Sequence, residues 1–477
     1  MLSLHFERLH KMKIEFLGAI AEVTGSKFLI TTKNNKKLLL DCGMYQGKGL
    51  ETDAMNRDLG FEPAEIDILL LSHAHIDHSG LIPYICKNGF KGKIYCTHAT
   101  RDLCSIMLPD SGNIQESDVL DFNKKRARIG LPPVEPIYTS RDAFASLRFF
   151  VSMPFDLEIT IEEGVKVVFT NSGHILGGSA VNLTITEDGE EKRLCYTGDI
   201  GRYNKNLLID PSPFPQADYI IAESTYGDRK HEPVNFAEEK LGLVVQSTCV
   251  KKLGKLLIPS FTIGRCQEII YSLNNLKKAK KLPDVPIFVD SPLAISATDI
   301  FRLHTECFKE NVLTLIRTQK DPFGFDNLHY VRTMEDSKRL NTHNRPCIII
   351  SASGMMEAGR IKHHLANNIE DKKTTVLVVG YCAPGTLGKK IIDGEKIVSI
   401  YGNKYKVNAD IEEIESLSGH GDYEEMCHYL SCQDKSKVKE IFLVHGELPA
   451  QQAYQKYLTD NGFAKVSIPT KKEAVEV

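Results

Sequence analysis

The stretch from Leu69 to Gly80, LLLSHAHIDHSG, constrains the fold of this chain more than any other. The apolar run from Ile66 to Leu71 predicts a buried strand. It leads directly into the pattern H-x-H-x-D-H, which comprises His73, His75, Asp77 and His78. Side chains two apart in an extended segment point the same way, so the first two histidines can hold one cation together. Where the chain then turns, Asp77 and His78 can face a second cation, and these side chains suit Zn²⁺.

Similar strand-to-turn junctions carry further histidines and aspartates. His174 lies in NSGHILGGS after the run VKVVFT, and Asp199 lies in YTGDIGR after RLC. His420 lies in LSGHGD, and His445 follows the apolar run IFLV in FLVHGE. Each motif alone is compatible with ordinary turn chemistry, because glycine permits tight backbone geometry. The recurrence of histidine after an apolar strand, at His174 and again at His445, weakens that ordinary interpretation.

The order of predicted elements indicates two domains in an α/β protein. At 477 residues the chain exceeds the ~250–300 residues at which one core stops growing. Short β runs with glycine turns from Lys13 to Ile200 predict a layered sandwich. From about Asp218, buried strands alternate with helical stretches, which predicts a parallel, doubly wound sheet. Short strands return after Gly394, so we expect a first domain at 12–215 and 396–477 with a second, at 216–395, inserted into it.

The composition favours one cellular compartment but does not identify a substrate. The formal net charge of −3 gives no bulk attraction to nucleic acid, so polyanion binding would need a local cationic cleft. The 12 cysteines form no C-x-x-C pair, which favours reduced thiols in a cytoplasm. The N-terminus lacks the apolar core of a secretory signal, and no apolar run approaches ~18 residues. We therefore expect a cytoplasmic protein without a membrane partner.

Taken together, the motifs resemble the metallo-β-lactamase superfamily and, within it, the β-CASP branch. That branch includes the pre-mRNA 3′-end-processing endonuclease and its bacterial and archaeal relatives. The resemblance covers nearly the whole chain. The motifs shared with the superfamily hold Asp41 in LLLDCG, the His73 to His78 cluster, His174 and Asp199. Those shared with β-CASP members hold Glu223 in AESTYGDR, His420 in SGHGD and His445 in VHGE.

The resemblance implies an αββα metallo-β-lactamase sandwich interrupted by a doubly wound β-CASP domain. It also implies two Zn²⁺ per chain. One would be held by His73, His75 and His174, the other by Asp77, His78 and His445, and Asp199 would bridge them. Asp41 would orient a ligand from behind. The catalytic residues implied are Asp77, Glu223 and His420, the last two as a pair beside the metals.

These expectations lead to a zinc-dependent ribonuclease that hydrolyses phosphodiester bonds of single-stranded RNA. Two cations ~3.5–4 Å apart can share a water and lower its pKa toward ~7, which supplies a bridging hydroxide as nucleophile. His420 would protonate the leaving sugar oxygen. Turns of the inserted domain would contact phosphates, and the candidates are Arg265, Ser351, Ser353, Gly354 and Arg360.

Three alternatives remain open at this point. A DNA nuclease would share most motifs, although His445 in VHGE favours RNA. A small-molecule hydrolase of the same superfamily would lack the long insertion and the Glu223 and His420 pair. A non-catalytic scaffold of RNA processing would have lost motif residues, whereas this chain keeps them. A homodimer is also left open.

Overall fold

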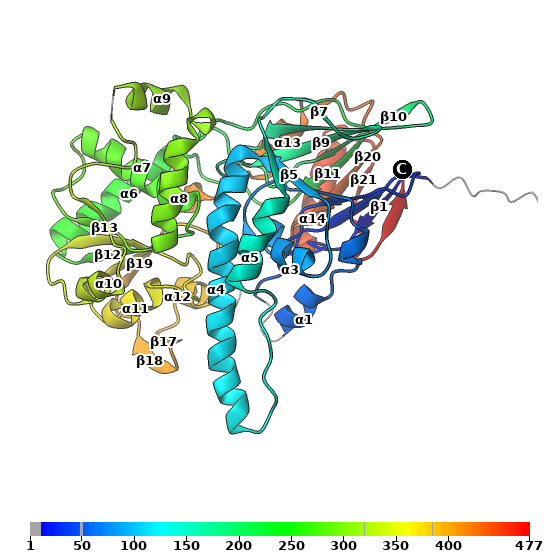
Figure 1. Ribbon diagram of the computed structural model, residues 1–477. Coiled ribbons are helices and arrows are strands. Elements are labelled where there is room, and N and C mark those ends of the chain that lie inside the picture. The colour runs from blue at the N-terminus through cyan, green and yellow to red at the C-terminus, as the bar shows by residue number, and fades with distance from the viewer. Residues whose placement is uncertain (1–10, 48–50, 319, 384) are drawn as a thin grey trace, which may run out of the picture. The chain divides into compact units, whose positions relative to one another are not determined.

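The computed structural model describes residues 11–47, 51–318, 320–383 and 385–477, and they form two compact units (Figure 1). Unit 1 comprises the described residues of Met1–Ile200, Pro211–Lys230 and Asp422–Val477, and unit 2 comprises Gly201–Asp210 and His231–Gly421. The limits of these compact units differ from the domain limits expected at 215/216 and 395/396, which stay a prediction. The N-terminal stretch that predicts no secretory signal includes residues 1–10, which lie outside the described residues.

Two sheets packed face to face build unit 1. The first runs in the order β22 (Ala474–Glu476), β1 (Lys13–Phe16), β2 (Phe28–Thr31), β3 (Lys37–Leu40), β4 (Ile68–Leu70), β5 (Lys93–Thr97) and β6 (Phe150–Met153). The second runs in the order β21 (Val466–Ser467), β20 (Glu440–Val444), β11 (Tyr219–Glu223), β10 (Glu190–Tyr196), β9 (Ser179–Glu187), β8 (Val165–Asn171) and β7 (Ile159–Glu162). Each sheet combines antiparallel hairpins with parallel strands.

Apolar side chains from both sheets form one core between them. Phe16 and Phe28 of the first sheet share this core with Phe169 and Val181 of the second. Along β8 buried and more exposed residues alternate at first, as expected for a strand with one face toward a core. In contrast, β20 (EIFLV) is buried throughout, because its other face is also covered.

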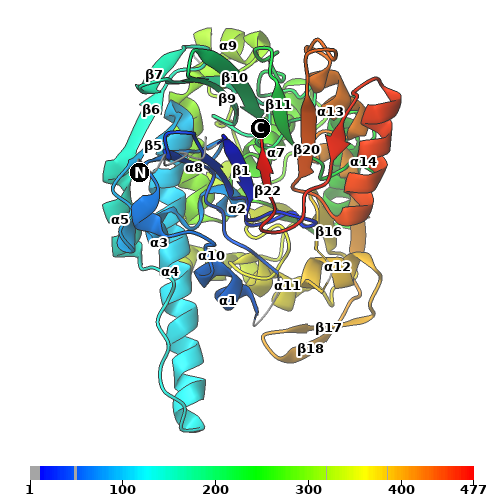
Figure 2. The same cartoon turned by 90° about the vertical axis from the view of Figure 1, so that its right-hand side faces the viewer.

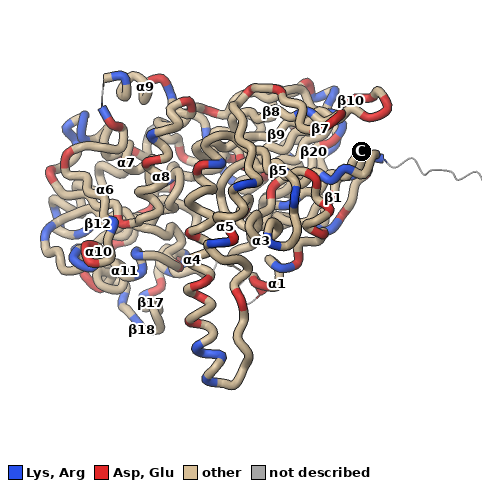
Figure 3. Tube along the Cα trace, viewed as in Figure 1, with Lys and Arg blue, Asp and Glu red and all other residues tan. Residues whose placement is uncertain are grey.

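Helices cover the outer faces of both sheets (Figures 1 and 2). The first sheet has α3 (Ile82–Lys87), α4 (His98–Arg128) and α5 (Ser140–Ser146) beside it. Met426 of α13 (Tyr423–Leu430) and Leu458 of α14 (Leu448–Asp460) pack against Ile220 and Ile441 of the second sheet. The Thr97 hydroxyl accepts from the Thr100 amide and caps α4. Acidic and basic residues are interspersed along the far end of this helix (Figure 3).

The sheet of unit 2 is parallel throughout its described strands. Its order is β14 (Leu328–Tyr330), β13 (Ile287–Val289), β15 (Cys347–Ser351), β12 (Lys255–Pro259), β16 (Thr375–Val378) and β19 (Asp410–Glu413). The helices connecting these strands are α6 (Asn235–Val245), α7 (Arg265–Lys278), α8 (Pro292–Leu303), α9 (Glu310–Arg317), α10 (Met334–Asn341), α11 (Ile361–Asn368) and α12 (Leu387–Ile392). A separate antiparallel hairpin joins β17 (Ile397–Ile400) to β18 (Asn403–Lys406).

Short helices complete the described chain. In unit 1 these are α1 (Glu51–Arg57), α2 (Ile76–Ser79) and the 3₁₀ turns η1 (Pro63–Glu65) and η2 (Leu147–Phe149). In unit 2 they are the π-helical η3 (Gln246–Lys251) and the 3₁₀ turns η4 (Thr305–Cys307) and η5 (Glu415–Leu417).

The expected fold class is confirmed, since unit 1 is an αββα sandwich and unit 2 carries the doubly wound parallel sheet. Every cysteine of the described chain is a free thiol. Within the described ranges, we find no helix that is both long and apolar enough to span a bilayer.

Candidate metal centre

The candidate ligands lie just beyond the carboxyl ends of strands in unit 1. In the second sheet β8, β10, β11 and β20 run in one direction, because β9 is antiparallel to both β8 and β10 and the others are parallel neighbours. His174 follows β8, Asp199 follows β10 and His445 follows β20. In the first sheet β4 ends at Leu70, three residues before His73. The topology therefore gathers residues from distant parts of the sequence at one edge of the sandwich.

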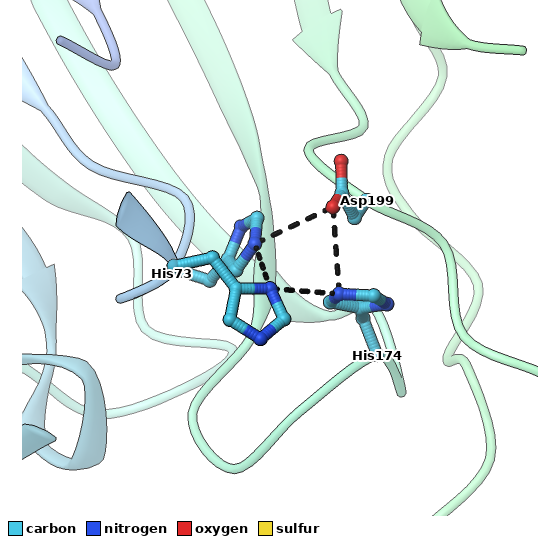
Figure 4. Close-up of side chains that lie close together, drawn as sticks. His73, His174 and Asp199 are labelled. Atoms are coloured by element: carbon cyan, nitrogen blue, oxygen red, sulfur yellow. Dashed lines mark hydrogen bonds and ion pairs between the residues drawn. The ribbon is translucent and has the colours of Figure 1, made fainter. Parts of the chain in front are cut away.

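One group of ligand atoms centres on His75. Its Nδ1 lies 3.1 Å from His73 Nε2 and 3.2 Å from His174 Nε2. Asp199 Oδ2 lies 3.4 Å from the same Nε2 atoms of His73 and His174. Figure 4 shows the rings of His73 and His174 turned toward the Asp199 carboxylate. His73, His174 and Asp199 are buried, and His75 is partly exposed.

The spacing of these four atoms fits a tetrahedral cation. Zn–N and Zn–O bonds of about 2.0–2.2 Å place neighbouring ligands of a tetrahedron ~3.3–3.6 Å apart. The four measured separations, from 3.1 to 3.4 Å, lie within a few tenths of an ångström of that edge. The donor set of three imidazoles and one carboxylate is also one that Zn²⁺ prefers.

A second group forms around His78 and His445, whose Nε2 atoms lie 3.3 Å apart. Asp199 supplies its other oxygen, Oδ1, at 3.2 Å from His78 Nε2. Asp77 Oδ2 lies 3.5 Å from His445 Nε2 and 3.9 Å from His78 Nε2. Asp199 thus offers one carboxylate oxygen to each group.

The hydrogen bonds at Nδ1 of His78 and His445 influence whether Nε2 of each ring carries a proton or a lone pair. His78 Nδ1 donates to the Asp41 carboxylate at 2.7 Å. The Thr225 hydroxyl donates to the His445 carbonyl, so its oxygen accepts from His445 Nδ1 at 3.0 Å. In a neutral imidazole only one nitrogen carries a proton. With both rings neutral, the two Nε2 atoms would present lone pairs 3.3 Å apart, a separation that suits two ligands of one cation.

Asp41 anchors this arrangement from behind, through contacts that the sequence did not reveal. Its Oδ2 accepts from His78 Nδ1, from the Tyr196 hydroxyl and from the Ser72 hydroxyl, each at 2.7 Å. The Ser72 oxygen in turn lies 3.0 Å from His73 Nδ1, which leaves His73 Nε2 facing inward. Sequence reasoning missed Ser72, Tyr196 and Thr225, although the positions of Ser72 before His73 and Tyr196 at the end of a strand were available signals.

Burial and charge act in opposite directions on the titratable groups. Burial lowers the pKa of His78, but the Asp199 and Asp77 carboxylates outweigh it and raise the pKa well above its ordinary value. For His73, burial and the neighbouring His78 together lower the pKa well below its ordinary value. Burial raises the pKa of Asp77, but His78 and His445 outweigh it, so the net pKa falls. The site accommodates positive charge between its carboxylates.

The backbone around the centre is held in unusual conformations. Asp41 and His445 have φ angles of 56° and 49°, a region that non-glycine residues rarely enter. Gly43 approaches the main chain of the ligand segment so closely that an added Cβ would lie 1.6 Å from the Asp77 carbonyl oxygen. Only glycine fits this contact, which fixes the loop after β3 against the ligand turn.

The two residues expected beside the metals fall in different units. Glu223 ends β11 in unit 1, is buried, and accepts a hydrogen bond from the Ile200 amide. His420 belongs to unit 2, where its backbone forms an antiparallel bridge with Gly201. Their pairing stays a prediction.

The residues expected to contact phosphates have protein partners in unit 2. Arg265 is buried and pairs with Glu268. The Ser351 hydroxyl donates to the Asp290 carbonyl at 2.8 Å, and Arg360 Nη1 donates to the Asp290 carboxylate at 2.6 Å.

The remaining two candidates belong to the turn after β15. The Ser353 hydroxyl accepts from the Ala358 amide at 3.3 Å. An added Cβ on Gly354 would lie 2.7 Å from the Phe261 ring. These contacts give all five candidates structural roles, and phosphate binding by them stays a prediction.

Comparisons with known proteins agree with the fold class. Residues 22–232 match the metallo-β-lactamase superfamily, residues 266–391 the Beta-Casp domain, and residues 404–469 the Zn-dependent metallo-hydrolase RNA specificity domain. A ribonuclease of Thermus thermophilus is 33% identical over 466 residues, which is 98% of this chain and 100% of that protein. An RNase J-like protein of Methanocaldococcus jannaschii is 30% identical over 91% of this chain and 92% of its own length.

A solved structure of a protein of unknown function from Enterococcus faecalis shares the fold. It has a TM-score of 0.55 at 14% sequence identity, and the match covers 98% of this chain and 100% of that chain.

Proposed function

Because this chain belongs to the β-CASP family of the metallo-β-lactamase superfamily, we propose that it is a metal-dependent ribonuclease. Its substrate is single-stranded RNA, whose phosphodiester bonds it hydrolyses. The observation that carries the proposal is the 3.3 Å separation of the His78 and His445 Nε2 atoms beside Asp199, which suits two ligands of one cation. The ribonuclease names of two relatives that match over nearly their whole lengths support the choice of RNA.

The family implies a divalent metal, and the donor set favours two Zn²⁺. His73, His75 and His174 would hold one ion, and Asp77, His78 and His445 the other, with one oxygen of Asp199 for each. When bound, two such ions lower the pKa of a water between them and neutralise charge on a phosphoryl oxygen. Asp41 keeps the proton of His78 on Nδ1, so that Nε2 stays available.

Proton transfer to the leaving group falls to His420 in this proposal. Cleavage of a phosphodiester leaves a sugar oxygen that must gain a proton, and an imidazolium near neutral pH is suited to donate it. His420 pairs through its backbone with Gly201, which follows Asp199 by only two residues in the chain. Glu223 would hold the ring in orientation, and Asp77 acts both as ligand and as part of the catalytic set.

Parallel assays on labelled RNA, single-stranded DNA and a β-lactam test the substrate class. The proposal predicts that the zinc-loaded chain cleaves RNA and leaves the other two intact. Turnover of the lactam would indicate a small-molecule hydrolase, and preferential DNA cleavage would indicate a DNA nuclease. End-labelled RNA with a 5′-phosphate or a 5′-hydroxyl then separates internal cleavage, which produces ladders, from removal of single nucleotides. A cytoplasmic location and a homodimer stay predictions.

A further inference from the structure

The β17–β18 hairpin of unit 2 presents an unusual turn. Its two central residues, Tyr401 and Gly402, have φ angles of 52° and 79°. A two-residue loop with both φ angles positive is a type I′ turn, which favours Asn-Gly or Gly-Gly. A bulky aromatic residue is an outlier in this conformation. The hairpin therefore keeps a tyrosine where local conformational preference would select asparagine, which points to a role for the ring itself.

The Tyr401 ring is surrounded by basic and aromatic groups but remains accessible. The His363 ring lies 4.8 Å from it, centroid to centroid, at an interplanar angle of 30°. Lys362 Nζ lies 4.8 Å from the ring centroid, and it also donates to the Glu357 carbonyl. Even so, 53% of the tyrosine stays exposed, so another planar group has ring surface to stack on.

The strands beside this turn are basic. The segment from Lys396 to Lys406, KIVSIYGNKYK, contains three lysines and no carboxylate. Lys396, Lys404 and Lys406 are exposed. The Glu370 carboxylate nearby accepts from the Lys406 amide at 2.9 Å. Figure 3 shows basic residues along this hairpin.

We propose that this surface, defined as Lys362, His363, Tyr401, Lys404 and Lys406, is a single-stranded RNA contact in which a base stacks on Tyr401 and the lysines bind flanking phosphates. An aromatic platform beside cationic side chains is how proteins hold single strands without reading sequence. The inference rests on the proposed ribonuclease function and adds a contact made by groups other than the metal ligands.

Tyr401→Asn tests the base contact. The full chain would be titrated with fluorescent single-stranded RNA carrying phosphorothioate linkages, which slow hydrolysis. Loss of stacking is expected to weaken binding about 5- to 100-fold. Because asparagine suits a type I′ turn, the melting temperature should stay level or rise, which excludes misfolding as the cause. Tyr401→Phe keeps the ring and should keep the affinity. Unchanged affinity of the asparagine variant would overturn the proposal.

A charge-reversal pair tests the phosphate contacts. Lys404→Glu combined with Lys406→Glu should weaken binding and reduce the salt slope by about 0.7 for each phosphate that the variant no longer binds. Lys280→Glu combined with Lys281→Glu makes the same change of charge at another exposed site of unit 2 and should have little effect. Equal weakening by both pairs would show a non-specific charge effect and contradict the proposal.

Steady-state kinetics separate this inference from the proposed function. For long RNA the Tyr401→Asn variant should show a raised KM with kcat unchanged. If the wild type cleaves RNA and the variant has the same KM on long RNA, this surface is excluded while the ribonuclease function stands. If the zinc-loaded wild type cleaves no RNA, the proposed function fails as well.

Discussion

Each unit buries a cluster of histidine and carboxylate at the carboxyl ends of its strands, but the two clusters differ in how their groups face each other. In unit 2 Asp290 Oδ2 accepts from the Ser337 hydroxyl at 2.6 Å and from His364 Nε2 at 2.7 Å. Its Oδ1 accepts from Arg360, and His364 Nδ1 faces the Asn341 amide oxygen at 2.9 Å. The Asp290 carboxylate thus accepts from a hydroxyl, a ring nitrogen and a guanidinium, so its charge is compensated by protein side chains.

In unit 1 the inner atoms face atoms of the same kind. His78 Nε2 and His445 Nε2 lie 3.3 Å apart, and Asp199 adds a carboxylate oxygen. Positive charge stabilises such a buried group of imidazoles and carboxylates, and a metal ion or a proton on His78 can supply it. Arg360 and Ser337 donate to the carboxylate of unit 2, whereas unit 1 brings several imidazoles and carboxylates together, and this difference distinguishes the candidate metal centre from a structural network.

The largest expected effect comes from removing a ligand. Asp77→Ala or His78→Ala should lose bound metal and reduce RNA turnover by more than the about 10²–10⁴-fold that a proton-transfer group contributes. Elemental analysis measures the bound zinc, and initial rates on labelled RNA measure the turnover. Ser337→Ala in the unit 2 network is the matched control and should keep metal and rate. Full metal content in both ligand variants would contradict the claim that the unit 1 cluster, unlike the unit 2 network, holds metal.

Removing the proposed proton donor should affect rate alone. His420→Ala is expected to leave the chain folded with its metal, while kcat falls by about 10²–10⁴-fold. The pH profile of kcat should also lose its alkaline limb, because that limb reports the acid in the enzyme–substrate complex. Loss of zinc in this variant would instead identify His420 as a ligand.

Breaking the unit 2 network should affect stability alone. Asp290→Ala leaves Arg360 and His364 without their shared acceptor and should destabilise the chain by about 3–5 kcal/mol. Burial raises the pKa of Asp290, but hydrogen bonds from His364, Ser337 and Arg360 outweigh it and lower the pKa. A lowered native pKa contributes stability above the unfolded value of about 4, and that contribution is lost on acidification. Denaturant titrations should therefore give a difference in unfolding free energy between variant and wild type that is large at pH 7 and smaller at lower pH. A difference that does not change with pH would contradict this account.

The smallest effect is expected for Asp41, which contacts the metal ligand candidate His78. Asp41→Asn should weaken metal affinity about 10–100-fold, because His78 loses the carboxylate that keeps its proton on Nδ1. Competition with a chelator measures the affinity. Tyr196→Phe removes one donor to the same carboxylate and should have a smaller effect. An equal loss in both variants would indicate that packing, rather than the charge of Asp41, holds the ligand.

Much of the fold and the site followed from local patterns. Alternating apolar runs predicted the strands, and strand-to-turn junctions marked the histidines, because both signals lie within short stretches. The contacts of Ser72, Tyr196 and Thr225 could not be predicted, since each joins strands whose pairing the sequence does not specify. For the same reason the sequence did not reveal that the Arg360 guanidinium donates to Asp290, and phosphate binding by Arg360 stays a prediction.

The number of zinc ions bound by the purified chain tests the central claim most directly. Elemental analysis after dialysis against metal-free buffer should give two zinc ions per chain, and a His445→Ala variant should keep fewer. A folded wild-type chain that binds no metal would contradict the account, because the buried histidines and carboxylates of unit 1 are proposed to hold two cations.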